Sequence, residues 1–248
     1  MNASHPERSK GSALPPLTRA HQSHRVYSLD MSFAVPPLYP ILDASVFPPD
    51  AAHRDQFLTD IAKALAEAGV TLLQLRMKHT SPEEILTAAH TLRAAAPSSM
   101  RLILNDYAEL FPQTGFDGLH LGQDDLAIEK ARQRLSPRQA LIGLSTHTPE
   151  QVIAANNTDA DYLAIGPVFA TGSKPDASPV IGLEGVRQAR LRTTKPLVAI
   201  GGITLANARS VHEAGADSIA VISAVFGKGS NPPAQAATLA RDFLKLFR

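Results

Sequence analysis

The chain has 248 residues, of which 44% are hydrophobic, and it carries a formal net charge of +1 at neutral pH. This balance gives no reason to expect nucleic acid or an anionic membrane surface as a partner. Cysteine is absent, which excludes disulfides, thiol nucleophiles and cysteine-based metal centres, and no apolar run reaches the ~18 residues of a membrane span. The apolar content suffices for one large core, and the lack of cysteine fits a cytoplasmic protein.

Residues 1–36 differ in composition from the rest of the chain. They are rich in serine, proline, histidine and arginine and show no amphipathic period, so we expect a disordered N-terminal extension. No apolar segment identifies a secretory signal, whereas the scarcity of acids leaves a transit peptide as an alternative. Met31 could also be the native start. We favour an inert extension, followed by a single catalytic domain over residues 37–248.

From residue 38 onward, short apolar runs alternate with helical patterns. Strands are expected at residues 38–43, 70–76, 101–105, 118–121, 140–144, 162–165, 196–200 and 218–222. Helices are expected at residues 52–68, from Ser81 onward, at 124–135 with Asp124 as N-cap, from Thr148 onward, at 205–214 and at 233–247. Regular alternation of this kind demands parallel strands, and eight such units close into a (β/α)8 TIM barrel. An open, doubly wound sheet is the alternative.

The second strand ends in polar residues that share one face. Because strand side chains alternate, Gln74, Arg76 and Lys78 point the same way, and such a set suits an anionic ligand. Carboxylates follow the third and fourth strands at Asp106 and Asp125. Barrel enzymes work at the carboxyl ends of their strands, so these groups should meet at one mouth. The pattern predicts a site for a diphosphate and a Mg²⁺ ion held by the two aspartates.

Other strand ends add weaker signals. Gly201-Gly202 and Ile222-Ser223 follow the last two strands, where backbone N–H groups often bind phosphate, although two tight turns explain them equally well. Lys174, in the long loop at 166–182, could bind phosphate oxygens or could be a solvated lysine. His120 lies inside a strand and is interpreted as a packed histidine rather than a metal ligand, and His147 has no partner that the sequence identifies.

Taken in order, these segments resemble the thiamine phosphate synthase family. The motifs that carry the resemblance are Gln74-Leu75-Arg76-Met77-Lys78, Asn105-Asp106, His120 to Asp125, Ser145 to Thr148, Gly166 to Phe169 with Thr171 to Lys174, Ile200 to Ile203, and Ile222-Ser223-Ala224. Each motif is weak alone, but the ordered set is specific and spans the chain from about Leu38 to its end.

The resemblance implies a transferase that joins hydroxymethylpyrimidine diphosphate to hydroxyethylthiazole phosphate. The residues it implies for the pyrimidine diphosphate are Gln74, Arg76, Lys78 and Asn105, with Ser145 and Lys174 on the diphosphate and Mg²⁺ on Asp106 and Asp125. Those it implies for the thiazole phosphate are Thr171, Ser173 and the backbone of Gly201, Ile222 and Ser223. Arg76, Lys78, Ser145 and Lys174 would act catalytically, by stabilising the departing diphosphate.

Departures from the family pattern are local. Met77 stands where an acid is common, Tyr107 where a charged residue is frequent, and Ser173 replaces a threonine. Competing interpretations are a thiazole tautomerase-like paralogue, a non-catalytic sensor of a phosphorylated ligand, and a sugar-phosphate isomerase. The expected partners are small molecules, with a homo-oligomer left open.

Overall fold

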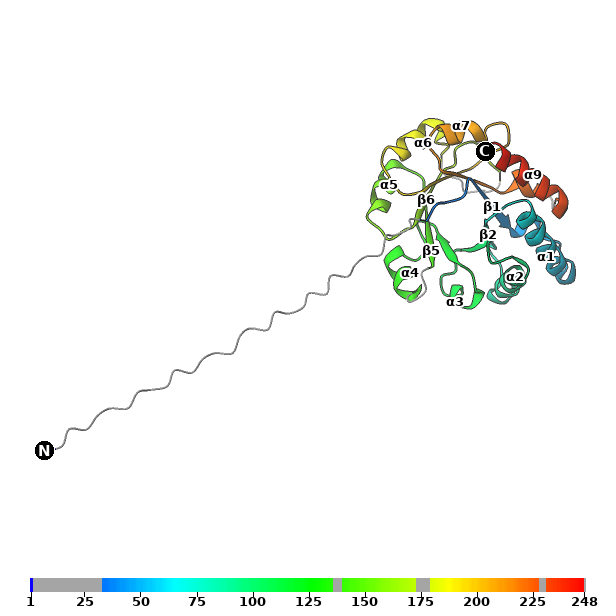
Figure 1. Cartoon of the computed structure of the whole chain (residues 1–248), viewed down its shortest axis with the longest axis horizontal. Helices are drawn as coiled ribbons and strands as arrows, with labels where there is room; N and C mark the ends of the chain where they lie inside the picture. The colour runs from blue at the N-terminus through cyan, green and yellow to red at the C-terminus, as the bar shows by residue number, and fades with distance from the viewer. Residues whose placement is uncertain (2–32, 136–139, 173–178, 228–230, 248) are drawn as a thin grey trace. The chain divides into compact units, whose positions relative to one another are not determined.

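The computed structural model describes Met1 and residues 33–135, 140–172, 179–227 and 231–247. Eight parallel strands pair in chain order, β1 with β2 through to β8, and β8 pairs back with β1 to close a barrel. Figure 1 shows the helices as a ring around these strands. The predicted (β/α)8 TIM barrel is therefore confirmed, and the open sheet is excluded.

The strands are short and lie at the expected places. Their bounds are β1 (Leu38–Asp43), β2 (Leu72–Arg76), β3 (Arg101–Asn105), β4 (Gly118–Leu121), β5 (Leu141–Thr146), β6 (Tyr162–Ile165), β7 (Leu197–Ile200) and β8 (Ser218–Val221). The helices among the described residues are α1 (Ala51–Glu67), α2 (Pro82–Ala95), α3 (Phe111–Thr114), α4 (Ile128–Leu135), α5 (Pro149–Asn156), α6 (Gly182–Arg190), α7 (Ala208–Glu213), α8 (Ser223–Phe226) and α9 (Pro233–Lys245), with a 3₁₀ turn at Ala44–Val46.

Helix starts follow local capping chemistry. Ser81 and Glu84 form a reciprocal capping box on α2, and the Thr148 side chain accepts from the Gln151 N–H at the start of α5. Both starts were predicted. The prediction that Asp124 caps α4 is wrong, because that helix begins only at Ile128 and Asp124 lies exposed in the preceding loop.

Strand β5 runs two residues further than expected. The sequence predicts its end at residue 144, but Ser145 and Thr146 continue the ladder opposite Ala164 and Ile165 of β6. The Thr146 hydroxyl also donates to the Ala164 carbonyl at 2.9 Å, which satisfies a polar group in a buried position. Ser145 is therefore held by the sheet rather than by a loop.

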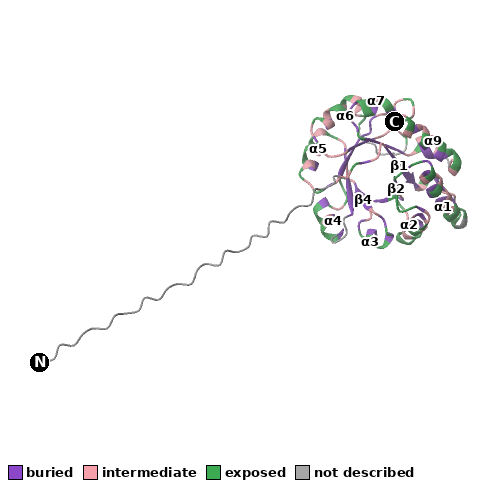
Figure 2. Cartoon of the chain, viewed as in Figure 1, coloured by how far each residue is buried: buried purple, intermediate pink, exposed green. Residues whose placement is uncertain are grey.

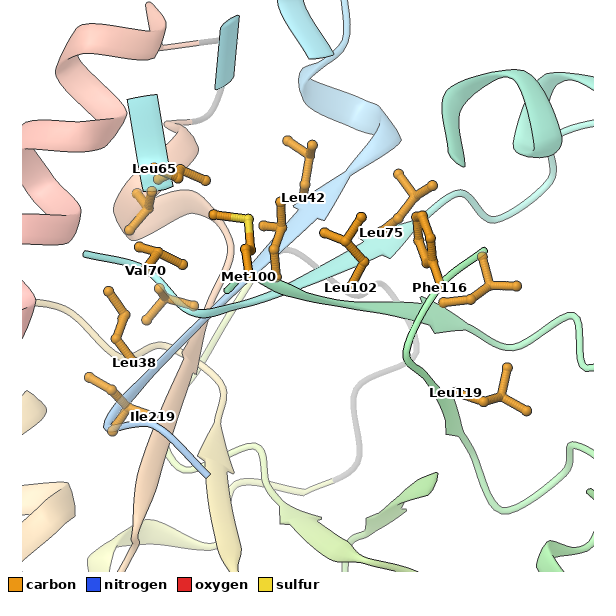
Figure 3. Close-up of a cluster of buried hydrophobic side chains, with 14 of the residues drawn as sticks. Leu38, Leu42, Leu65, Val70, Leu75, Met100, Leu102, Phe116, Leu119 and Ile219 are labelled. Atoms are coloured by element: carbon orange, nitrogen blue, oxygen red, sulfur yellow. The ribbon is translucent and has the colours of Figure 1, made fainter. Parts of the chain in front are cut away.

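The core has two layers, as expected for a barrel. The outer layer packs the helices onto the strands, and Figure 3 shows Leu42, Leu75 and Leu102 within it. The inner layer fills the barrel with Val35, Tyr39, Ile41, Leu72, Ile103, Leu141, Tyr162, Ala164, Val198 and Ala220. Figure 2 accordingly shows buried strands inside helices whose outer faces are exposed. These side chains fill the described interior of the barrel, so we expect a ligand to bind at a mouth.

One clamp recurs three times at the N-terminal ends of the strands. In each case an aspartate lies just before β4, β6 or β8. Its carboxylate accepts a hydrogen bond from a backbone N–H near the start of the preceding strand, and it also pairs with an arginine of α2, α4 or α6. The sets are Asp117 with Leu102 N and Arg93, Asp161 with Ile142 N and Arg132, and Asp217 with Leu197 N and Arg190. These contacts fix strand register at the end opposite to the expected site.

The barrel unit begins at Phe33, earlier than the predicted boundary at residue 37. Val35 is buried inside the barrel, and the Phe33 ring lies 6.1 Å from the Tyr162 ring and 5.2 Å from the Arg101 guanidinium. The rest of the predicted extension, residues 2–32, lies outside the described residues. No helix in the described part of the chain is long and apolar enough to cross a membrane.

Candidate active site

A cavity opens at the carboxyl ends of the strands, where the sequence places the site. Its lining is Tyr39, Ile41, Gln74, Arg76, Asn105, His120, Ser145, Thr146, His147, Ala164, Val198, Ile200, Ala220 and Ile222. These residues come from every strand of the barrel or from the loop that follows it. Five predicted site residues, Gln74, Arg76, Asn105, Ser145 and Ile222, are thus brought together by closure of the sheet.

The polar face of β2 supplies the basic side of this mouth. Gln74 is buried, and its amide Nε2 donates to the Tyr39 hydroxyl at 2.8 Å. Arg76 donates to the carboxylate of Asp43 at the end of β1. Lys78, which is about half exposed, lies with its Nζ 3.4 Å from Asp106 Oδ2. The alternation predicted for these three residues therefore leads from the barrel interior to its rim.

Asp43 is a site residue that the sequence analysis did not single out. Burial opposes its ionisation, but hydrogen bonds from Ser45 and from Arg76 outweigh burial and lower its pKa. A charged carboxylate therefore orients the Arg76 guanidinium. The signal was present in the sequence, because Asp43 ends its strand as Asn105 does, but a carboxylate there also serves as an ordinary turn cap.

The two predicted metal ligands are in contact. Burial and the nearby Asp125 carboxylate raise the pKa of Asp106 to about 6, and Lys78 only partly offsets them. Asp125 Oδ2 also accepts from the Gly122 N–H at 2.6 Å, which holds the loop after β4 in a tight turn. Asp106 and Tyr107 both have positive φ, at 60° and 47°, so the loop after β3 carries backbone strain beside this pair.

Asn105 presents a hydrogen-bond donor to the cavity. Its side chain is buried, and Nδ2 has no hydrogen-bond partner among the residues that the structure describes. Arg76 Nε is likewise buried and has no hydrogen-bond partner among the described residues. Unsatisfied buried donors are costly, and they are explained where a ligand supplies the acceptor.

Ser145 points into the mouth from β5 and contacts a histidine. Its Oγ lies 2.9 Å from His120 Nε2, and the other ring nitrogen, Nδ1, lies 3.0 Å from the Tyr162 hydroxyl. The interpretation of His120 as a packed residue is confirmed, since it is buried and its ring stacks on that of Tyr162. His147, which had no assigned partner, lies with Nδ1 2.7 Å from the Gly166 carbonyl oxygen.

The phosphate side of the predicted site is described in part. Gly201 and Gly202 have positive φ, and a Cβ on either would overlap residues 167–170 of the loop after β6, so these glycines also serve packing. Ile222 precedes the short helix α8, which begins at Ser223, and the sequence analysis missed this helix. Thr171 lies in the loop after β6, whereas Ser173 and Lys174 lie outside the described residues.

The donor set is suited to a hard cation bound together with an anion. In the described part of the chain, no group of three or more carboxylates and histidines gathers as a self-sufficient metal site. The Asp106–Asp125 pair offers two carboxylates, which matches a Mg²⁺ ion that takes its remaining ligands from water and from substrate phosphates.

Comparison with known proteins identifies the family of this chain. The sequence pattern of the family described as thiamine monophosphate synthase matches residues 38–225. A thiamine-phosphate synthase of Koribacter versatilis is 51% identical over 189 residues, covering 76% of this chain and 88% of that protein. A second, of Albidiferax ferrireducens, is 44% identical over 68% of this chain and 77% of its own length.

The likeness extends to three dimensions. A solved thiamine phosphate pyrophosphorylase of Pyrococcus furiosus superposes with a TM-score of 0.70 at 33% identity, covering 84% of this chain and 95% of that one. The family pattern covers the strands that build the mouth, from β1 to β8, and the transferases it describes act on small molecules. On sequence and fold, this chain belongs to the thiamine monophosphate synthase family.

Proposed function

We propose that the chain joins 4-amino-2-methyl-5-hydroxymethylpyrimidine diphosphate to 4-methyl-5-(2-phosphooxyethyl)thiazole, giving thiamine phosphate and diphosphate. The observation that carries this proposal is the contact between Asp106 and Asp125 beside Lys78. Asp106 directly follows Asn105, which lines the cavity together with Arg76. Two adjacent acids with cations around them suit a substrate that brings both negative charge and a metal ion.

Asp106 and Asp125 would hold Mg²⁺. The fit rests on the raised pKa of Asp106, because two acids that repel each other are stabilised when a divalent cation lies between them. When bound, the ion supplies positive charge next to the diphosphate. We propose Mg²⁺ dependence on this basis.

The chain's own residues would then bind and orient the substrates. Gln74 and Asn105 would hold the pyrimidine, while Arg76, Lys78 and Ser145 would stabilise the negative charge that grows on the diphosphate as its bond to the methylene breaks. Lys174 would add to that stabilisation, and the thiazole phosphate would lie near Thr171, Ser173 and the backbone of Gly201, Ile222 and Ser223.

No general base is required for the bond that forms. The thiazole nitrogen attacks through its own lone pair, and the aminopyrimidine can stabilise positive charge on its methylene, so a dissociative displacement fits. The catalytic power then comes from preorganised charge, and the loss of one such contact costs about 3–4 kcal/mol of barrier, or roughly a hundred- to thousandfold in rate.

The test is formation of thiamine phosphate from the two purified substrates, with Mg²⁺ and after EDTA treatment. Asp125→Ala should lose about a hundredfold or more in turnover, whereas the matched Asp124→Ala change in the same exposed loop should have little effect. Lys174→Ala should also lose turnover strongly. Full activity in EDTA, or wild-type rates in Asp125→Ala, would contradict the assignment. We further propose that this chemistry takes place in the cytoplasm.

A further inference from the structure

Five side chains form a continuous hydrogen-bonded chain across the inside of the barrel. Gln74 Nε2 donates to the Tyr39 hydroxyl at 2.8 Å, and the Tyr39 and Tyr162 hydroxyls lie 3.0 Å apart. The Tyr162 hydroxyl lies 3.0 Å from His120 Nδ1, and His120 Nε2 lies 2.9 Å from Ser145 Oγ. The chain joins two residues expected to bind substrate, through three that have no assigned role.

The middle of this hydrogen-bonded series is buried and closely packed. Tyr39 and Tyr162 are at most 1% exposed, and the Tyr162 and His120 rings stack with centroids 5.5 Å apart. Gly143 makes room for the stack, because a Cβ there would overlap both rings. Burial raises the pKa of both tyrosine hydroxyls well above 10, so each keeps its proton and has one hydrogen to donate.

With one proton on each hydroxyl, this series of hydrogen bonds has a direction from donor to acceptor. Tyr39 accepts from Gln74, and among the described residues the Tyr162 hydroxyl is the acceptor within reach of the Tyr39 proton, so we assign Tyr39 as the donor to Tyr162. Tyr162 then donates to His120 Nδ1, which must be the unprotonated nitrogen of a neutral ring. The proton on Nε2 is donated to Ser145 Oγ, and the hydroxyl proton of Ser145 remains available to an acceptor in the cavity.

We propose that Tyr39, Tyr162 and His120 are positioning residues that fix the hydrogen-bonding polarity of Gln74 and Ser145. At one end, the Gln74 carbonyl oxygen is kept as an acceptor for an amino group. At the other end, the Ser145 hydroxyl is kept as a donor to an anionic oxygen. This inference rests on the proposed function, whose pyrimidine substrate carries an exocyclic amine at one end and a diphosphate at the other. The opposite polarity would present the wrong group at both ends.

The first test reads the tautomer of His120 in the ligand-free protein. Long-range ¹H–¹⁵N NMR of ¹⁵N-histidine-labelled protein, with the signal assigned by its loss in a His120→Asn variant, should show a proton on Nε2 and none on Nδ1. Tyr162→Phe should change this signal to a mixture of tautomers. The control Tyr107→Phe, which removes a hydroxyl bonded instead to the Met77 carbonyl, should leave it unchanged. A proton on Nδ1 in the wild-type protein would overturn the proposed polarity.

The second test is a double-mutant cycle on turnover. Tyr162→Phe should lower kcat about tenfold in the otherwise wild-type protein, because Ser145 would no longer be held as a donor to the departing diphosphate. In a Ser145→Ala background the same change should lower kcat by less than about twofold. Loss of the fixed orientation of the Gln74 amide should instead raise KM for the pyrimidine substrate. Equal losses of kcat in both backgrounds would mean that Tyr162 acts only through the general fold.

The two tests separate this inference from the proposed function. The NMR signal needs no substrate, so it can fail while thiamine phosphate is still formed by the wild-type protein. Conversely, an absence of product from the wild-type protein would overturn the proposed function and leave the tautomer result standing as a property of the barrel interior.

Discussion

Asp106→Asn should stabilise the metal-free protein near neutral pH and at the same time remove most of its activity. The Asp106 side chain is 16% exposed, and its pKa is raised from 3.8 to about 6 by burial and by Asp125. The folded chain therefore holds a proton that the unfolded chain has released, so stability is full below pH ~3.8 and falls as pH rises through about 6. Asparagine, which does not ionise, avoids that loss.

The expected size follows from the difference between the two pKa values. At 1.36 kcal/mol for each pH unit, the interval from 3.8 to about 6 corresponds to about 3 kcal/mol above neutral pH. The pKa of about 6 already includes the opposing effect of the Lys78 ion pair, so the loss of that pair in the variant reduces the difference no further. The variant should thus be about 3 kcal/mol more stable than the wild type at pH ~7.5, and this gap should shrink by about 2 kcal/mol at pH ~4.5.

Urea unfolding in EDTA, at both pH values, measures the gap. Mg²⁺ should stabilise the wild type more than the variant, since a ligand that binds only the folded state adds to its stability. Turnover of Asp106→Asn should fall by about a hundredfold or more. Asp124→Asn, an exposed neighbour of the other acid, is the control and should change little. A variant no more stable than the wild type at pH ~7.5, or a gap independent of pH, would refute the reasoning.

Three further predictions concern the scaffold. Asp161→Ala should lower the free energy of unfolding in urea by about 2–3 kcal/mol and leave kcat intact, because it removes the acceptor for the Ile142 N–H and Arg132 far from the mouth. The control Asp159→Ala changes an exposed neighbour and should be neutral, and a large loss of kcat in Asp161→Ala would contradict this prediction. Gly143→Ala should lower the thermal midpoint through overlap with the stacked rings, and an unchanged midpoint would show that the barrel interior can relax. A chain starting at Met31 should keep its full free energy of unfolding. A chain starting at Pro37 lacks Phe33 and Val35 and should be about 2–4 kcal/mol less stable. Equal stability of the two chains would refute the packing role of these residues.

The sequence was enough to predict the barrel and most strand positions. Buried parallel strands are continuous apolar runs, and caps such as Ser81 and Thr148 act within three residues, so both signals are local. The end of β5 was missed because Ser145 and Thr146 are typical of loops, and only pairing with β6 keeps them in the sheet. Helix α4 was started too early because an aspartate after a strand has the same local pattern whether it caps a helix or turns a loop.

The candidate site was predictable at its rim and less so in its interior. Arg76, Asp106 and Asp125 stand at strand ends, where the chemistry of one residue type suggests its use. The role of Tyr39 and Tyr162 could not be predicted, because their hydroxyls are 123 positions apart in the chain and meet only when the barrel closes. In the same way, the three aspartate–arginine clamps repeat every two βα units, yet the residues between them differ too much in number for a repeat to be visible in the sequence.

The two ends of the barrel therefore differ in how far their polar groups are satisfied. The N-terminal end is satisfied at its three clamps, since each aspartate accepts from a strand N–H and from an arginine, although the buried Ser218 Oγ at that end has no partner among the described residues. The mouth is not: it holds two acids in contact, positive φ at Asp106 and Tyr107, and buried donors on Asn105 and Arg76 that lack partners among the described residues. Each of these costs stability in the free protein. In the proposed function, a cation would relieve the repulsion between the two acids, and phosphate oxygens would accept from the two buried donors. A site built in this way would bind its ligands with groups already in place. The aspartate–arginine clamps at the opposite end of the same strands stabilise the fold and offset the cost of the mouth.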